Sequence, residues 1–239
     1  MNFEFGSLAM LYMDPVYLII ILATLGVSAL VSNTLKRRFR EYSQVPVQYT
    51  GAQIAQQMLR DHGITDVKVV SVPGHLSDHY NPAKKTVNLS EMVYHHNSVA
   101  AAAVAAHECG HAVQHQKAYL WLTLRSKLVP ITQISSNLLN IVMFIAVIAM
   151  FTSGNPTLMW VWVGMFGLTT LFAFITLPVE FDASKRALKW LEGSGSTLRM
   201  EHKLAKNALF WAAMTYVVGA IGSLAMLAYY VLMLLGRRN

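Results

Sequence analysis

The stretch that decides the fold is NSVAAAAVAAHECGHAVQH, residues 97–115. Asn97 or Ser98 can cap a helix N-terminus, and the alanine-rich run after them has high helix propensity and permits close packing. His107 and His111 are four residues apart, so a helix projects both imidazoles from one face. The spacing therefore predicts a metal site on a closely packed helix.

Glu108 lies one position beyond His107, about 100° around the helix. From there its carboxylate can reach a water held by the metal without binding the ion itself. Zinc suits neutral imidazole and lowers the pKa of a bound water towards about 7, so Glu108 can accept the proton and pass it to a leaving amine. Gly110 leaves room for the metal or a neighbouring backbone. The alternative is a polar helix face that binds no metal.

A catalytic zinc needs a third protein ligand. His115 lies about 12 Å along the helix from His107, which favours a surface role for it. Glu180 follows an apolar run and is the favoured ligand; Asp182 is its rival, and the acid that does not bind zinc can orient a ligand histidine. His202 is also a candidate oxyanion stabiliser. The full candidate set is His95, His96, His115, Glu180, Asp182, Glu201 and His202.

The composition indicates a membrane protein. Of the 239 residues, 54% are apolar and 13% are charged, and the apolar residues gather in long uncharged runs. The single cysteine, Cys109, excludes an intrachain disulfide. The net charge of +7 could suggest a nucleic-acid partner, but the basic residues flank apolar runs and no nucleic-acid motif is present, so we expect none.

Four apolar runs can span a bilayer if the second begins near residue 131. The polar residues between 132 and 137 leave a buried amphipathic helix as the alternative for that run. The first run is followed, not preceded, by basic residues, which predicts an uncleaved anchor. The runs are Val16–Ser32, Leu138–Thr152, Pro156–Leu177 and Ala208–Leu235.

The basic residues predict the orientation of these spans. Two segments, 36–127 and 185–206, hold 17 of the 19 Lys and Arg residues, and four spans put both segments on one side. The positive-inside rule makes that side cytoplasmic. Both chain ends would then lie outside, which disagrees mildly with Arg237 and Arg238 unless the fourth run is re-entrant.

The remaining cytoplasmic sequence predicts a small α+β part in a mainly α protein. Thr50 can cap a helix, residues 67–72 and 86–89 have strand character, and 78–85 reads as a loop or turn. We expect the following organisation: 1–35, tail and first span; 36–130, cytoplasmic catalytic domain; 131–178, a transmembrane helical hairpin; 179–207, a cytoplasmic helical segment with the third ligand; 208–239, fourth span and C-terminus.

Three blocks, 78–114, 177–191 and 208–221, resemble the YugP-type neutral zinc metallopeptidases. More distantly, the layout is similar to the HtpX and CAAX prenyl protease group of gluzincins. The resemblance implies a zincin-like core with a short β-hairpin, and His107, His111 and Glu180 as zinc ligands. The distant group has a Glu-x-x-x-Asp motif whose aspartate position is Ser184 here, so the role of orienting a histidine falls to Asp182 or to no residue.

The distant group also places an extended strand beside the active helix to bind substrate. The candidates are Thr86, Val87, Asn88 and Leu89, with an ordinary structural hairpin as the alternative. His79 and Tyr80 are either a turn pair or one wall of the cleft.

These observations together predict an integral membrane zinc metalloendopeptidase of a bacterial plasma membrane. We expect one catalytic Zn²⁺, a peptide or membrane-protein substrate and a catalytic domain that faces the cytoplasm. A role in membrane protein quality control follows only from the resemblance to HtpX. The rival is a non-hydrolytic zinc-binding scaffold or pseudoprotease. The oligomeric state is left open.

Overall fold

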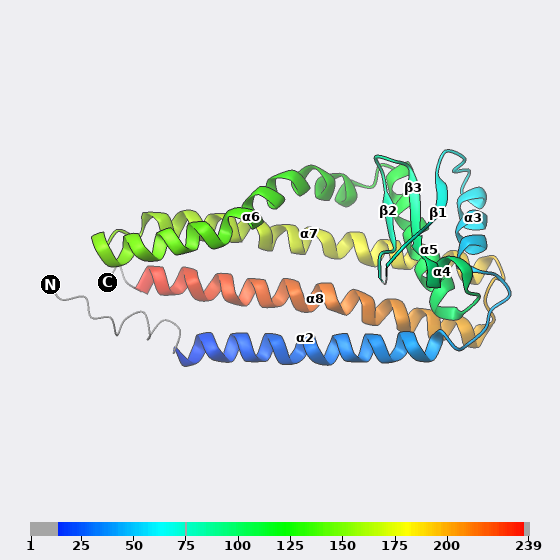
Figure 1. Ribbon diagram of the computed structural model, residues 1–239, viewed down its shortest axis with the longest axis horizontal. Coiled ribbons are helices and arrows are strands. Elements are labelled where there is room, and N and C mark those ends of the chain that lie inside the picture. The colour runs from blue at the N-terminus through cyan, green and yellow to red at the C-terminus, as the bar shows by residue number, and fades with distance from the viewer. Residues whose placement is uncertain (1–13, 75, 237–239) are drawn as a thin grey trace. The chain divides into compact units, whose positions relative to one another are not determined.

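The computed structural model describes residues 14–74 and 76–236, and within them it contains seven helices and one three-stranded sheet (Figure 1). The predicted mainly helical fold with a small α+β part is confirmed. The chain forms two compact units, which are described separately below. The first comprises 14–30, 124–175 and 216–236, and the second comprises 31–123 and 176–215.

Four helices are long and apolar enough to cross a membrane, and they match the four predicted runs. The second and third form the predicted helical hairpin, in which Gly154 adopts a positive φ of 65° at the turn. The four helices are α2 (Pro15–Tyr42), α6 (Leu120–Ser153), α7 (Thr157–Gly193) and α8 (Arg199–Gly236).

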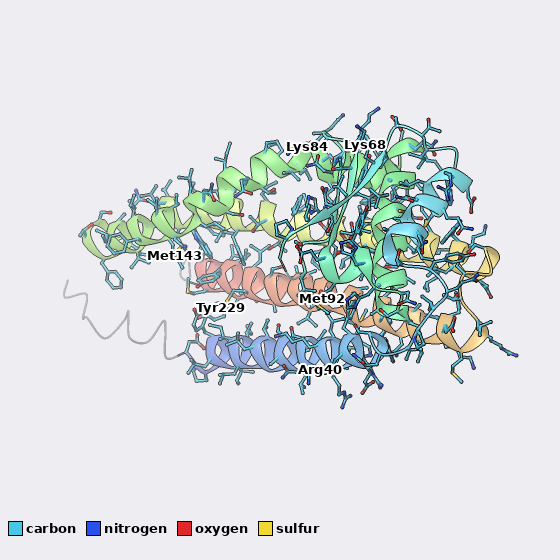
Figure 2. All side chains as sticks on the ribbon, turned by 45° about the vertical axis from the view of Figure 1, so that its right-hand side comes forward. Arg40, Lys68, Lys84, Met92, Met143 and Tyr229 are labelled. Atoms are coloured by element: carbon cyan, nitrogen blue, oxygen red, sulfur yellow. The ribbon has the colours of Figure 1, made fainter. Side chains whose placement is uncertain are left out.

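The first unit is held together by apolar contacts around Trp162 of α7. Its indole N–H donates to the carbonyl of Leu139 on α6 at 3.1 Å, and its ring lies edge-on to Tyr230 of α8. Met143 and Tyr229, labelled in Figure 2, belong to the same cluster. In α6 only Thr132, Ser135 and Ala146 are buried, so the alternative of a buried amphipathic helix is wrong.

The second unit packs short helices around α5 (Val99–Gln116). The helix α3 (Gly51–Asp61) begins with a complete capping box, in which Thr50 accepts from the Gln53 N–H and the Gln53 side chain accepts from the Thr50 N–H. A third helix, α4 (Glu91–His95), packs against both α3 and α5. The cap predicted at Thr50 is therefore confirmed.

The sheet has the order β1-β3-β2, formed by β1 (Lys68–Val72), β2 (His79–Asn81) and β3 (Thr86–Ser90). The strand β1 pairs with β3 in parallel, and β2 pairs with β3 as an antiparallel hairpin. The predicted hairpin exists, but its first strand lies in the segment predicted as a loop. Those three residues lack an alternating apolar pattern, and their strand geometry depends on pairing with β3.

The central position of β3 corrects one prediction. Thr86, Val87 and Asn88 pair with β1 on one side and with β2 on the other, and Leu89 pairs with Ser71 of β1. No edge remains at Thr86–Asn88 for an added peptide strand, so their predicted role as a substrate edge is wrong. The free edge on this side of the sheet belongs to β2.

The helix α7 continues without interruption through Pro178, where the sequence predicted a boundary between a span and a separate helical segment. Val179, Ala183, Ala187 and Leu191 follow one another at intervals of four and are fully buried. This apolar ridge stabilises the helix beyond the proline because it packs in the core of the second unit.

Candidate metal centre

The helix α5 is fixed at its start and along its length. Ser98 accepts from the Ala101 N–H at 3.2 Å, which confirms the N-cap predicted at Asn97 or Ser98. The alanines of the first turns are buried in the core, and the Cys109 thiol lies 3.5 Å from the carbonyl of Ala55. Burial raises the pKa of the Cys109 thiol well above its usual range, so the thiol stays protonated and serves packing.

Gly110 permits α5 to lie against α7. A Cβ atom at this position would stand 2.5 Å from the carbonyl oxygen of Ala183. The two backbones therefore touch directly, and this contact brings Glu180 of α7 to the face of α5 that carries His107 and His111. The prediction that Gly110 leaves room for a neighbouring backbone is confirmed.

His107, His111 and Glu180 form a group of metal-ligating atoms that all lie within 4.8 Å of one another. The Nε2 atom of His107 is 3.3 Å from Glu180 Oε2, and the Nε2 atom of His111 is 3.7 Å from it. Glu180 is 3% exposed, so the carboxylate is shielded from bulk water. Two imidazoles and one carboxylate thus converge on one point.

Hydrogen bonds determine which imidazole nitrogen of His111 is available. The amide nitrogen of Gln114 donates to the carbonyl of Val179 at 2.8 Å, and a carbonyl can only accept. The other end of the amide, Oε1, therefore faces His111 Nδ1 at 3.0 Å, and Nδ1 must be the protonated nitrogen. This leaves Nε2 of His111 with a lone pair for a metal.

Ser184 makes the corresponding contact to the first histidine. Its hydroxyl oxygen lies 3.2 Å from His107 Nδ1 and can accept a hydrogen bond from it, which leaves Nε2 for a metal. Ser184 is the residue that the sequence resemblance aligned with the aspartate of the Glu-x-x-x-Asp motif. A hydroxyl at this position therefore contacts the histidine as a carboxylate would.

Asp182 was predicted either to bind the metal or to orient a ligand histidine directly. In the structure Gln114 lies between Asp182 and His111. Its Oδ2 accepts from the Gln114 amide at 2.8 Å and from Arg186 Nε at 2.5 Å. Asp182 is outside the group of ligating atoms and reaches His111 only through Gln114.

The carboxylate of Glu108 is held by the edge of the sheet. Its Oε2 accepts from the backbone N–H of Tyr80 in β2 at 2.9 Å. The Tyr80 hydroxyl in turn lies 2.9 Å from His115 Nδ1. Tyr80 therefore connects the edge strand to α5 at Glu108 and at His115, which favours the cleft wall over the turn pair.

The carboxylates of Glu108 and Glu180 favour positive charge in the site. Burial acts to raise the pKa of Glu180, but hydrogen bonds from the protonated forms of His107 and His111 outweigh burial and hold that pKa well below its usual range. Burial acts to lower the pKa of His111, yet the contacts with Glu180 and Glu108 raise it overall. Both shifts favour a cation, or a proton in its place, among these side chains.

Among residues 14–74 and 76–236, the other candidate ligands stay outside the ligating group. His202 is in the first turn of α8, and its Nδ1 is buried without a hydrogen-bond partner in this described part of the chain. The candidates outside the group are His95, His96, His115, Asp182, Glu201 and His202.

The donor set fits zinc. Two neutral imidazoles and one carboxylate are a known protein ligand set for catalytic zinc, which keeps a further position open. Here His107 Nε2, His111 Nε2 and a Glu180 oxygen would hold the ion. Gln114 fixes the required tautomer of His111, and Ser184 can accept from His107 Nδ1 in the tautomer that a metal needs.

Comparison with known proteins places this fold and site in a class. The sequence profile of the family described as "Putative neutral zinc metallopeptidase" matches residues 17–235. The chain therefore belongs to this family, and the resemblance stated from its sequence blocks is confirmed.

A particular relative is the "Putative membrane protease YugP" of Bacillus subtilis (strain 168). The chain is 36% identical to it over 225 residues, which cover 93% of this chain and 98% of the relative. No solved structure matches the chain significantly.

Proposed function

We propose that this protein is a membrane zinc endopeptidase that hydrolyses peptide bonds with Glu108 as general base. The observation that carries the proposal is the convergence of His107, His111 and Glu180, with Glu108 beside them on the same helix. The family and its membrane-protease relative support the same class of activity.

A zinc ion in this site would supply Lewis acidity, which lowers the pKa of water and polarises a peptide carbonyl. The side chains supply the rest of the chemistry. The Tyr80 N–H holds Glu108 Oε2 and leaves Oε1 to accept the proton of the attacking water. The same carboxyl group then donates that proton to the amine that leaves. Ser184 and Gln114 keep both imidazoles in one orientation throughout.

The edge strand β2 is the better candidate for substrate binding than β3. The Tyr80 N–H points away from β3, since it reaches Glu108 on α5, and the outer side of β2 is therefore directed towards the site. A peptide held in extended form along β2 would lie beside the base, and main-chain pairing would give a broad sequence preference.

The substrates that fit this arrangement are membrane or membrane-proximal proteins. Four candidate spans tether the chain to a bilayer, and the distribution of basic residues supports a cytoplasmic catalytic unit. A role in membrane protein quality control is an analogy with HtpX.

A zinc-binding scaffold is the competing function. A structural zinc site is closed by four protein ligands, whereas a catalytic site has three and an open position. The three ligating residues found among the described residues, together with the carboxylate of Glu108 beside them, support the enzyme.

The test is Glu108→Gln in the purified full-length protein. We expect bound zinc to remain near the wild-type level and casein cleavage to fall by at least a hundredfold, because the amide cannot accept a proton. The matched control is Glu91→Gln, which removes an exposed carboxylate of α4 and should leave both quantities unchanged. Full cleavage by Glu108→Gln would refute the mechanism.

A further inference from the structure

The helix α6 carries an exposed line of amide side chains inside an apolar span. Gln133, Asn137 and Asn140 are all exposed and are separated by four and three residues, the spacing of one helix face. Phe144, 68% exposed, continues the line after four more residues. We call these four residues the amide seam.

The amide seam lies within α6, one of the four helices that can cross a membrane. Leu139, adjacent to Asn140, accepts a hydrogen bond from Trp162, and Trp162 belongs to the second turn of α7. The apolar run of α7 extends from there to Leu177. Asn140 therefore lies beside a contact with the apolar part of α7, and Asn137 and Gln133 lie about one and two turns before it on α6.

The amide seam lies to one side of the face by which α6 packs in its unit. That packed face comprises Leu139, Val142, Met143, Ala146, Val147 and Met150, and Met143 is labelled in Figure 2. At 100° per residue, the centre of the seam is ~120° around the helix from the centre of this packed face.

Among the described residues, these amides have fewer hydrogen-bond partners than they have donors and acceptors. The Gln133 amide donates to Asn137 Oδ1 at 3.2 Å, but the Asn137 NH₂ and the whole Asn140 amide have no hydrogen-bond partner among the described residues. Lipid tails offer neither donors nor acceptors, so uncovered amides in a span are costly. A partner helix that hydrogen-bonds to them would remove this cost.

From this geometry we propose that the amide seam is the contact between two copies of this chain, paired in parallel through α6. Each amide is both a donor and an acceptor, so the seam is complementary to itself about a two-fold axis. All copies share one orientation in the membrane, which aligns each amide with its own copy. The spacing of four and three residues is the repeat of a left-handed helix pair, and a polar residue in such a seam fixes its register.

Cysteine cross-linking in native membranes tests the contact. The full-length chain with Asn137→Cys or Phe144→Cys should form a disulfide-linked dimer when a mild oxidant is added. The wild type should not, because its one thiol, Cys109, is fully buried. The matched control is Leu22→Cys on α2, which is equally exposed at 66% but lies on another helix. No dimer at either seam position, or an equal yield at Leu22→Cys, would overturn the proposal.

Leucine variants test the amides themselves. Gln133→Leu, Asn137→Leu and Asn140→Leu keep the span apolar, so insertion should be unaffected. We expect each to weaken self-association about threefold in detergent or nanodiscs, and the triple variant to be monomeric by mass. Self-association that survives the triple variant overturns the proposal. If that variant keeps its dimer but loses cleavage of a membrane-anchored substrate, the seam binds substrate instead of a second copy.

Discussion

The hydrogen bonds around His107 and His111 determine how these residues can act. Gln114 and Ser184 each contact an Nδ1 atom, so both Nε2 atoms are directed to Glu180. The spacing of the two histidines was sufficient to predict the metal-binding face of α5. Glu180 was favoured over Asp182 by its place after an apolar run and was implied by the family resemblance, and the structure brings it to that face.

Gln114 was not recognised from the sequence, and Ser184 was noted only as a departure from the Glu-x-x-x-Asp motif, without a role at the site. Gln114 lies three residues after His111 on the same helix, and that spacing was a signal that could have indicated contact. Ser184 lies far from His107 along the chain, and only the packing of α7 on α5 brings the two together. Tyr80 was recognised only as a turn residue or cleft wall, since a backbone N–H partner leaves no trace in a sequence.

Gln114→Leu tests the orientation of His111. The variant keeps a side chain of similar size in a fully buried position but cannot accept from Nδ1. We expect zinc affinity to fall 10–100-fold, measured by competition with a chelator. The control is Gln116→Leu at the exposed end of the same helix, which should retain wild-type affinity. Unchanged affinity in Gln114→Leu would show that the tautomer is fixed by something else.

At the scale of elements, the contact between α5 and α7 creates the site. The histidines belong to one helix and the carboxylate to the other, and Gly110 allows their backbones to touch. The sequence predicted α5 from its cap and its alanine-rich start, and it predicted α7 as an apolar run followed by a separate helical segment. It did not predict that α7 passes through Pro178 or that β2 is a strand, since both depend on burial against other elements.

Gly110→Ala tests this contact. Alanine is intrinsically the better helix former, but its Cβ would collide with the Ala183 carbonyl, so the helices must separate. We expect a loss of about 1–3 kcal/mol in stability, seen as a lower unfolding temperature, together with weaker zinc binding. Gly193→Ala is the control, because a Cβ there meets open space. An unfolding temperature as high as that of the control would contradict the close contact.

At the scale of the whole molecule, the distribution of charge predicts the orientation in the membrane. The four predicted spans correspond to four long apolar helices, since length and hydropathy are properties of the sequence itself. The boundaries between the two compact units fall inside the four long helices α2, α6, α7 and α8, so the hydropathy of the sequence alone does not locate them. The side of the membrane on which each unit lies is a prediction from the basic residues.

Reporter fusions test that orientation. A reporter fused after residue 60 should be active only as a cytoplasmic protein, because the surrounding segment is rich in Lys and Arg. A second fusion at Gly154, in the turn between α6 and α7, should report the opposite side. An extracytoplasmic signal after residue 60 would reverse the topology.

The central claim is that His107, His111 and Glu180 hold one catalytic zinc ion. Its most direct test is elemental analysis of the purified wild type, Glu180→Ala and Asp182→Ala after saturation with zinc and removal of the excess, each paired with casein cleavage. The account predicts about one zinc per chain and zinc-dependent cleavage in the wild type. It predicts loss of both in Glu180→Ala and retention of zinc in Asp182→Ala, where only the support of Gln114 is weakened. Zinc retained by Glu180→Ala and lost by Asp182→Ala would contradict the account and assign the third ligand to Asp182.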